Sequence, residues 1–81
     1  MKLWDDKYQR FRQALKDLRI ESGLKQQELA DRLGKPQSYV SKYENGERGL
    51  DFLETLQICE AFGDGAYDKL LNAVQGKRKI N

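Results

Sequence analysis

The fold of this chain is decided by residues 23–48, which read GLKQQELADRLGKPQSYVSKYENGER. The stretch holds two short helical patterns, one over residues 26–33 and one over about residues 36–45. In the first pattern the two leucines and Ala30 fall on one side of a helix, and Gly34 is suited to end it. Two short helices joined by a tight turn that contains glycine are typical of a helix-turn-helix.

The pattern over residues 36–45 has a thin inward side and a polar outward side. Val40, Tyr43 and Glu44 share the inward side at helical spacing, and Pro36 suits the first turn. The outward side lacks carboxylates and consists of Gln37, Ser38, Ser41, Lys42 and Asn45. Such side chains can bond base edges and phosphates without repulsion, although composition alone leaves open a solvated helix surface with no ligand.

A long first helix is expected before this pair. Its apolar stripe at helical spacing consists of Trp4, Tyr8, Phe11, Leu15 and Leu18. Asp5 and Asp6 suit the positive N-terminal end of this helix, and Gly23 suits its end.

Two more helices are expected after the pair. The fourth begins at Asp51, because Asp51 and Glu54 have the spacing of a capping box, and it ends at Gly63. Its predicted inward residues are Leu53, Leu56, Cys59 and Phe62. The fifth helix covers about residues 66–75, and its predicted inward residues are Tyr67, Leu70, Leu71 and Val74.

The 81 residues predict one all-α domain of five helices, with a core at about residues 5–75 and a polar tail at residues 76–81. Lys and Arg outnumber Asp and Glu by 11 to 8 in residues 1–50, whereas residues 51–81 carry 4 against 5, which weakly favours an anionic partner.

Composition also excludes several classes of protein. There is no histidine, and the single cysteine belongs to no metal-ligand cluster, so neither an enzyme nor a metal or cofactor site is expected. No apolar run is long enough for a membrane span, and no signal-peptide core is found, so a cytoplasmic location is expected.

An ordered series of residues runs from about Leu15 to Leu71 and consists of Arg19, Gly23-Leu24, Gln26, Glu28-Leu29-Ala30, Leu33-Gly34, Gln37-Ser38, Val40-Ser41, Glu44, Asn45-Gly46, Leu53, Leu56 and Cys59. With this series the chain resembles the Cro/phage-repressor (Xre) family of bacterial and phage DNA-binding proteins. The resemblance implies a repressor-like fold and a sequence-specific regulator of transcription, a repressor or autoregulator that binds a pseudo-palindromic operator as a homodimer. The alternatives are an antitoxin with a toxin partner or a restriction-modification controller of the same fold and, third, a helical module that binds only protein.

The resemblance implies two sets of contacts with double-stranded DNA. The helix over residues 36–45 would lie in the major groove and read bases through Gln37, Ser38, Ser41 and Lys42. Phosphates would be bound by Lys25, Gln26, Asn45 and Arg48. Tyr39 lies on the flank, where contact with DNA and packing against the preceding helix are equal alternatives. Lys25 and Pro36 depart from the family, which usually has capping side chains at both positions.

Arg19 and Glu44 are expected to be structural residues. Glu44 lies on the inward side of its helix, where an unpaired carboxylate would be costly, and Arg19 borders the apolar stripe of the first helix. An ion pair between them is the simplest solution, and the resemblance implies the same pair.

The fifth helix offers the surface expected for a dimer, through Tyr67, Leu70, Leu71 and Val74. For Leu70 and Val74, closure of the monomer core is the favoured alternative.

Overall fold

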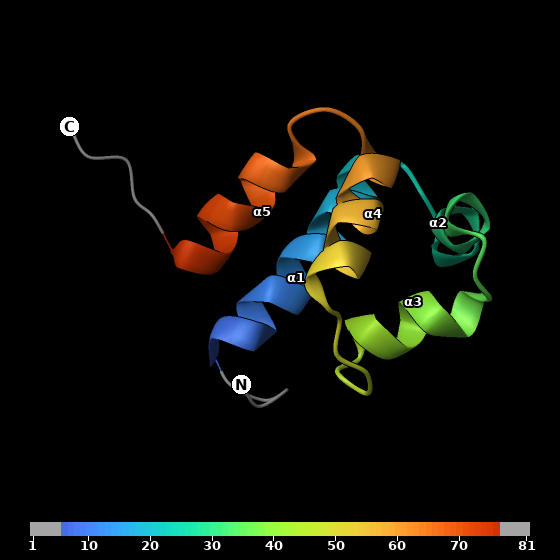
Figure 1. Ribbon diagram of the computed structural model, residues 1–81, viewed down its shortest axis with the longest axis horizontal. Coiled ribbons are helices and arrows are strands. Elements are labelled where there is room, and N and C mark those ends of the chain that lie inside the picture. Colours follow the sequence, from blue (N-terminus) through green and yellow to red (C-terminus); the bar gives the residue numbers. More distant parts are fainter. Residues whose placement is uncertain (1–5, 77–81) are drawn as a thin grey trace.

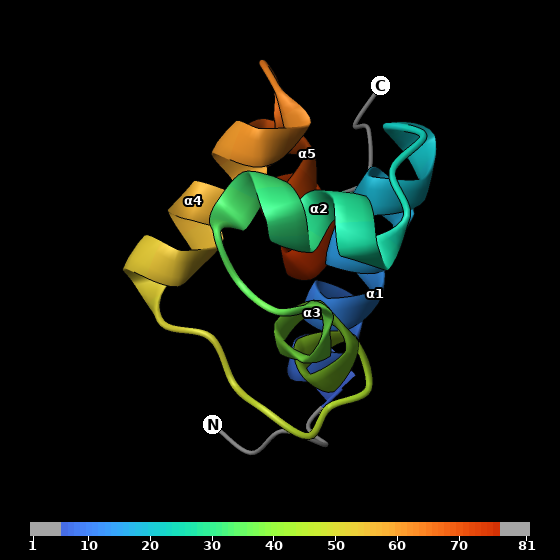
Figure 2. The ribbon, with the colours of Figure 1, turned by 90° about the vertical axis from the view of Figure 1, so that its right-hand side faces the viewer.

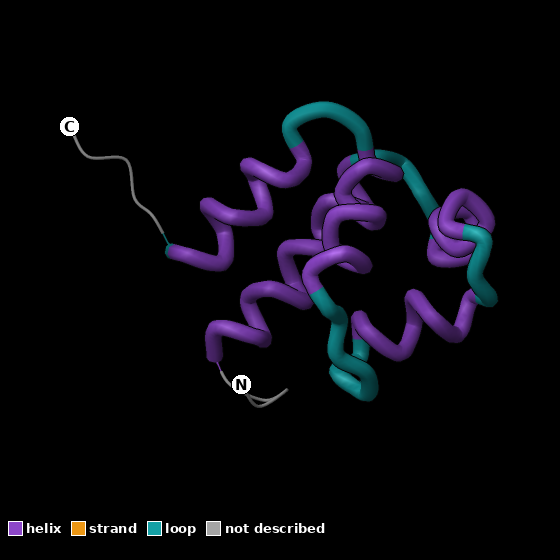
Figure 3. Tube along the Cα trace, in the orientation of Figure 1, coloured by secondary structure: helices purple, strands orange, loops and turns teal. Residues whose placement is uncertain are grey.

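The computed structural model describes residues 6–76, and this part of the chain contains five α-helices and no strand, as the sequence predicts. The helices are α1 (Asp6–Glu21), α2 (Gln26–Leu33), α3 (Gln37–Glu44), α4 (Phe52–Phe62) and α5 (Ala66–Gln75) (Figure 1). Short loops join them (Figure 3). The expectations for Trp4, Asp5 and residues 77–81 lie outside the described residues.

The helices pack around one core. The main packing partners are α1 with α5 and α2 with α3, and α4 contacts both α5 and α2. Figure 1 shows α1 and α5 at one side of the molecule and the α2–α3 pair at the other, with α4 between them. The largest fully buried side chains come from four of the five helices: Leu15, Leu29, Val40, Tyr43 and Ile58. The core therefore fixes the α2–α3 pair to the rest of the domain.

The turn between α2 and α3 is formed as the glycine pattern predicts. Gly34 has a φ of 68°, and its N–H donates to the carbonyl of Asp31 at 3.2 Å. The N–H of Lys35 donates to the carbonyl of Ala30 at 2.9 Å, which closes the end of α2. In Figure 2, α2 crosses the view while α3 is seen nearly end-on below it, so the two axes are strongly inclined to each other.

Pro36 caps α3, whereas the sequence predicts it in the first turn of the helix. It is the residue before α3, with φ −70° and ψ 156°, and the helix begins at Gln37. A helix cap has extended backbone geometry, which proline adopts readily, and the missing N–H of proline is not needed there. The two ends of α3 are therefore Gln37 and Glu44 rather than Pro36 and Asn45.

The predicted inward side of α4 is wrong at Leu53, whose exposed fraction is 68%. Residues nine positions apart, such as Leu53 and Phe62, lie on opposite sides of a helix that turns about 100° per residue. The core side of α4 instead carries Thr55, Ile58 and Cys59, which are buried. A series spaced by three residues therefore moves steadily around the helix, and its first member, Leu53, lies away from the core.

The predicted inward side of α5 holds in part. Leu70 is buried, and Tyr67 and Val74 are half-buried against the core. Leu71 is exposed, because it lies one residue beyond the buried position and about 100° around the helix from it.

Candidate nucleic-acid interface

The polar face of α3 is turned away from the core. Val40 and Tyr43 have exposed fractions of 0% and 1%, whereas Gln37, Ser38 and Lys42 are exposed and Ser41 is half-buried. Because the inward side chains are large and fully enclosed, α3 cannot rotate about its axis without opening the core. The four residues expected to read bases are therefore presented together on one side of a fixed helix.

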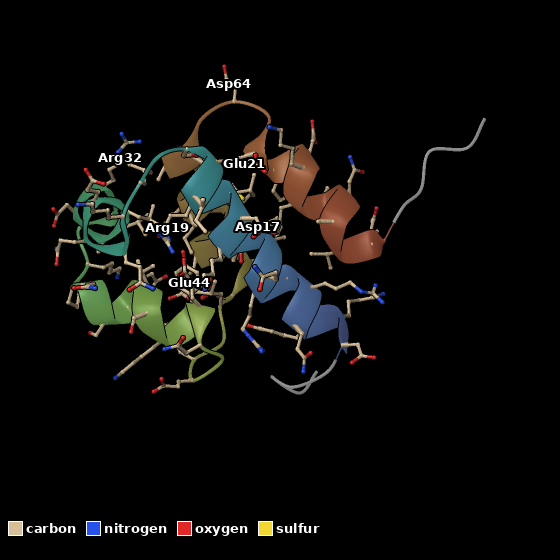
Figure 4. All side chains as sticks on the ribbon, turned by 180° about the vertical axis from the view of Figure 1, so that it is seen from behind. Asp17, Arg19, Glu21, Arg32, Glu44 and Asp64 are labelled. Carbon is tan, nitrogen blue, oxygen red and sulfur yellow. The ribbon has the colours of Figure 1, made fainter. Side chains whose placement is uncertain are left out.

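Arg19 and Glu44 form a buried ion pair beneath the helix-turn-helix (Figure 4). Arg19 Nε donates to Glu44 Oε2 at 2.7 Å, and Arg19 Nη2 donates to Glu44 Oε1 at 3.1 Å. Arg19 Nη1 also donates to the carbonyl of Leu24 at 2.9 Å. The side chain of Glu44 has an exposed fraction of only 2%, and the hydrogen bonds to Glu44 raise the pKa of Arg19. This geometry joins α1 to the C-terminal end of α3.

The ion pair continues into a chain of amide hydrogen bonds. Gln26 Nε2 donates to Glu44 Oε1 at 2.9 Å, and Gln37 Nε2 donates to Gln26 Oε1 at 3.3 Å. The chain thus links Arg19, Glu44, Gln26 and Gln37, and it ends on the first residue of α3. Sequence reasoning placed Gln26 and Gln37 in separate roles and missed this link, for which the only signal was a glutamine at the first position of both helices.

The N-terminal end of α2 has an incomplete cap. Lys25 has extended backbone geometry and makes no side-chain hydrogen bond to the helix, because an ammonium group has no acceptor. The carboxylate of Glu28 accepts a hydrogen bond from the N–H of Lys25 at 2.8 Å. The first turn of α2 therefore keeps N–H groups without a side-chain cap, next to the exposed side chain of Lys25, and such a helix start suits an anion.

Tyr39, for which the sequence left two roles open, is buried with an exposed fraction of 9%. Its ring meets that of Tyr43 edge to face at 5.8 Å. Two cations lie over it, with Lys35 Nζ at 5.5 Å and Arg48 Cζ at 4.8 Å from the ring centroid. Burial raises the pKa of Tyr39. The ring therefore packs within the protein.

Arg48, which was expected to bind phosphate, is held by the protein itself. Its Nη2 donates to Glu54 Oε2 at 2.7 Å, and its Nη1 donates to Glu54 Oε1 at 3.2 Å and to the carbonyl of Gly49 at 2.8 Å. The bonds from Arg48 to Glu54, and the N–H of Asp51 that donates to Glu54 Oε1 at 3.0 Å, lower the pKa of Glu54 to about 2. Glu54 therefore joins the expected capping box to an ion pair that the sequence did not predict.

The loop between α3 and α4 has further anchors on α1. The N–H of Leu50 donates to the hydroxyl of Tyr8 at 2.9 Å. Gly46 has a φ of +80°, and a Cβ placed there would lie 2.9 Å from Cζ of Arg12. The loop that carries Arg48 and the exposed Asn45 is thus bonded to α1 at Leu50 and lies close to α1 at Gly46.

Other classes of site find no support in the described part of the chain. Cys59 is buried, and burial raises the pKa of its thiol to about 11. Among residues 6–76 no group of His, Cys, Asp and Glu side chains could hold a metal ion. None of the described helices is long and apolar enough to cross a membrane.

Comparison with known proteins agrees with the geometry. The family model described as "Helix-turn-helix" matches residues 15–65. A solved structure, an XRE-family like protein from Pseudomonas syringae pv. tomato str. DC3000, is 43% identical, with a TM-score of 0.77. The match covers 86% of this chain and 84% of that one. No curated protein matches the sequence at a significant level.

Proposed function

We propose, since this chain belongs to the Xre/Cro-type helix-turn-helix family of DNA-binding proteins, that it is a sequence-specific regulator of transcription. The family is one of DNA-binding proteins rather than enzymes. The observation that carries the proposal is the outward face of α3, which is polar, free of carboxylates and held in place by a buried inward side. DNA covering this face would meet hydrogen-bonding groups and no negative charge.

In this proposal α3 lies in the major groove of double-stranded DNA. Gln37 and Ser38 stand at its N-terminal end, which enters deepest, and Ser41 and Lys42 follow one turn later. Lys25 binds a phosphate at the start of α2, and Gln26 can add the one amide N–H that its bond to Glu44 leaves over. Asn45 binds a phosphate on the other side of the groove. The amide chain from Glu44 through Gln26 supports Gln37 in its direction toward the bases.

We also propose that two copies bind one pseudo-palindromic site, with their recognition helices about 34 Å apart. One helix of eight residues reads only a few base pairs, so a second half-site supplies the missing selectivity. Phe52, Tyr67 and Leu71 line one hollow between α4 and α5. Exposed fractions of 63% for Phe52 and 68% for the adjacent Leu53 support an interface at this part of the surface. Leu70 has an exposed fraction of 3%, so it belongs to the monomer core.

Selection of bound sites from random duplexes tests the proposal. The chain should enrich a sequence with two-fold symmetry, and Lys42→Ala should relax the preference at one position in each half-site. Lys69→Ala is the matched control, because Lys69 is an exposed cation on α5, on the far side of the molecule from α3 (Figure 1). Enrichment of no sequence, or an equal effect of both variants, would contradict the proposal.

Sedimentation with and without the selected duplex tests the dimer. Leu53→Ser should shift the complex from two copies per duplex toward one, while the unfolding midpoint of the free chain stays the same because Leu53 is exposed. If the chain instead copurifies with an unrelated protein and forms no complex of two copies, the antitoxin alternative would be favoured.

A further inference from the structure

Three side chains form a unit between the recognition helix and the start of α4, which we call the Tyr39 clamp: Tyr39, Arg48 and Glu54. The guanidinium of Arg48 lies 4.8 Å from the centroid of the Tyr39 ring. The same guanidinium makes a double hydrogen bond to Glu54, with distances of 2.7 and 3.2 Å. The clamp thus connects a buried ring of α3 to the first turn of α4 through the loop between them.

The clamp changes what Arg48 can contribute to DNA binding. Its charge is matched by a carboxylate at 2.7 Å, and a third hydrogen bond to the carbonyl of Gly49 occupies Nη1 further. A phosphate that took Arg48 would have to displace Glu54, which stays ionised because its pKa is about 2. Because the charge of Arg48 is already balanced by Glu54, this arginine would release few counterions from DNA, so it adds little to the salt dependence of binding.

The position of Tyr39 explains why the clamp matters for recognition. Tyr39 follows Ser38 directly and precedes Ser41 and Lys42 by two and three residues. Its ring is buried against that of Tyr43, so the direction in which it is held helps, together with Val40 and Tyr43, to set the rotation of the N-terminal half of α3. A small rotation there would move the base-reading side chains away from their partners, and bidentate base contacts tolerate little displacement.

We infer that Arg48 and Glu54 are positioning residues for base readout: together they hold Tyr39 and so orient the recognition face of α3. The inference rests on the proposed function. It assigns Arg48 to sequence discrimination instead of to the phosphate contact that the family resemblance implied. It also gives Glu54, a residue of the first turn of α4, a role in the choice of DNA sequence.

The test compares two duplexes: the site selected by the wild-type chain and a duplex of equal length with its bases scrambled. The ratio of the two dissociation constants measures discrimination, and the slope of log K against log salt counts neutralised phosphates. Arg48→Ala is expected to lower the discrimination ratio about tenfold and to leave the slope at the wild-type value. Lys25→Ala is the positive control for a phosphate contact, with an expected fall of about 0.9 in the slope for each bound copy.

Glu54→Gln gives the sharpest contrast, because the amide oxygen can still accept the hydrogen bond from Asp51 while the charge that holds Arg48 is lost. The inference predicts reduced discrimination, as for Arg48→Ala. If Arg48 were a phosphate ligand restrained by Glu54, the same variant would bind both duplexes more tightly and with a steeper salt slope. Glu60→Gln, at an exposed carboxylate of α4, controls for the change of net charge.

Arg48→Lys keeps the charge and loses the planar double hydrogen bond to Glu54. This variant replaces Arg48→Ala in the test if the alanine variant does not fold. Reduced discrimination at an unchanged slope supports the clamp. If the discrimination ratio is unchanged in Arg48→Lys and Glu54→Gln, the inference is overturned. An equal loss of affinity for both duplexes is such a case, and it would reflect stability alone. If the wild-type chain selects no site at all, the proposed function falls as well, so the two failures are distinct.

Discussion

Replacing Glu44 by glutamine is expected to destabilise the fold by about 3 kcal/mol while the base preference stays the same. The amide oxygen can take the place of Oε1 and keep the bonds from Gln26 and from Arg19 Nη2. The amide nitrogen then replaces Oε2 and faces the N–H of Arg19 Nε across 2.7 Å, so two donors oppose each other. The buried guanidinium also loses its counter-charge.

The magnitude follows from these two losses. A hydrogen bond to a charged group contributes about 1.5–3 kcal/mol, and breaking a buried ion pair by removing one partner costs about 3–5 kcal/mol. The retained Oε1 bonds place Glu44→Gln at the lower end of that range. Because small domains are stable by only about 5–15 kcal/mol, this is a large share of the total.

Urea unfolding followed by circular dichroism measures the free energy of unfolding, and the slope against urea should not change. The thermal midpoint should fall by about 12–24 °C for a domain of this size. Glu60→Gln, at an exposed carboxylate, should change the free energy by less than about 0.5 kcal/mol. In a double-mutant cycle, Glu44→Gln should cost much less once Arg19 has been replaced by methionine.

An unfolding free energy equal to that of the Glu60→Gln control would refute the reasoning. So would a Glu44→Gln chain of normal stability that selects a different DNA site. The first result would show that the ion pair adds little to stability, and the second would assign Glu44 a role in recognition.

Three further predictions concern residues around the same helix. Tyr43→Phe should leave stability unchanged or raise it by up to about 1 kcal/mol in urea unfolding, because the buried Tyr43 hydroxyl has no hydrogen-bond partner among the described residues. Stability should fall as the pH drops from 4.5 toward 2, because the pKa of Glu54 is lower in the folded chain than its ordinary value of 4.5. The ionised carboxylate therefore stabilises the fold above pH 4.5, and this stability is lost as the folded chain takes up the proton. Glu54→Gln should flatten this part of the profile. Gly46→Ala should cost about 1–2 kcal/mol in the same assay, since its φ of +80° is left-handed and the new Cβ would crowd Arg12.

The helices and the helix-turn-helix could be predicted because their signals are local. The apolar spacing of α1, the glycine after α2 and the pair Asp51 and Glu54 each act within a few residues of the chain. The capping box at the start of α4 forms as its spacing predicts, with the N–H of Glu54 donating to Asp51 Oδ1 at 2.7 Å. Local patterns of this kind determine where helices begin and end.

The details that sequence reasoning missed depend on partners that are distant in the chain. The spacing of Tyr39 from Tyr43 is compatible with burial, but the guanidinium that lies over its ring comes from Arg48 in the loop after α3, and no pattern within α3 indicates that contact. The ion pair of Arg48 with Glu54 competes with the expected phosphate contact, and the choice depends on where the loop brings the guanidinium. The misplaced Leu53 has another cause: residues spaced by three move around a helix that turns about 100° per residue, so the expected inward series left the core side of α4.

The division of α3 into an enclosed side and an open side has a consequence for how such proteins diversify. Val40 and Tyr43 contribute most of the packing of the helix, whereas Ser38 and Lys42 contribute almost none. Substitutions at the exposed positions can therefore accumulate with little effect on folding, and each new combination presents a different surface to DNA. A small domain built in this way can acquire new target sequences through a few substitutions that leave its folding and its core unchanged.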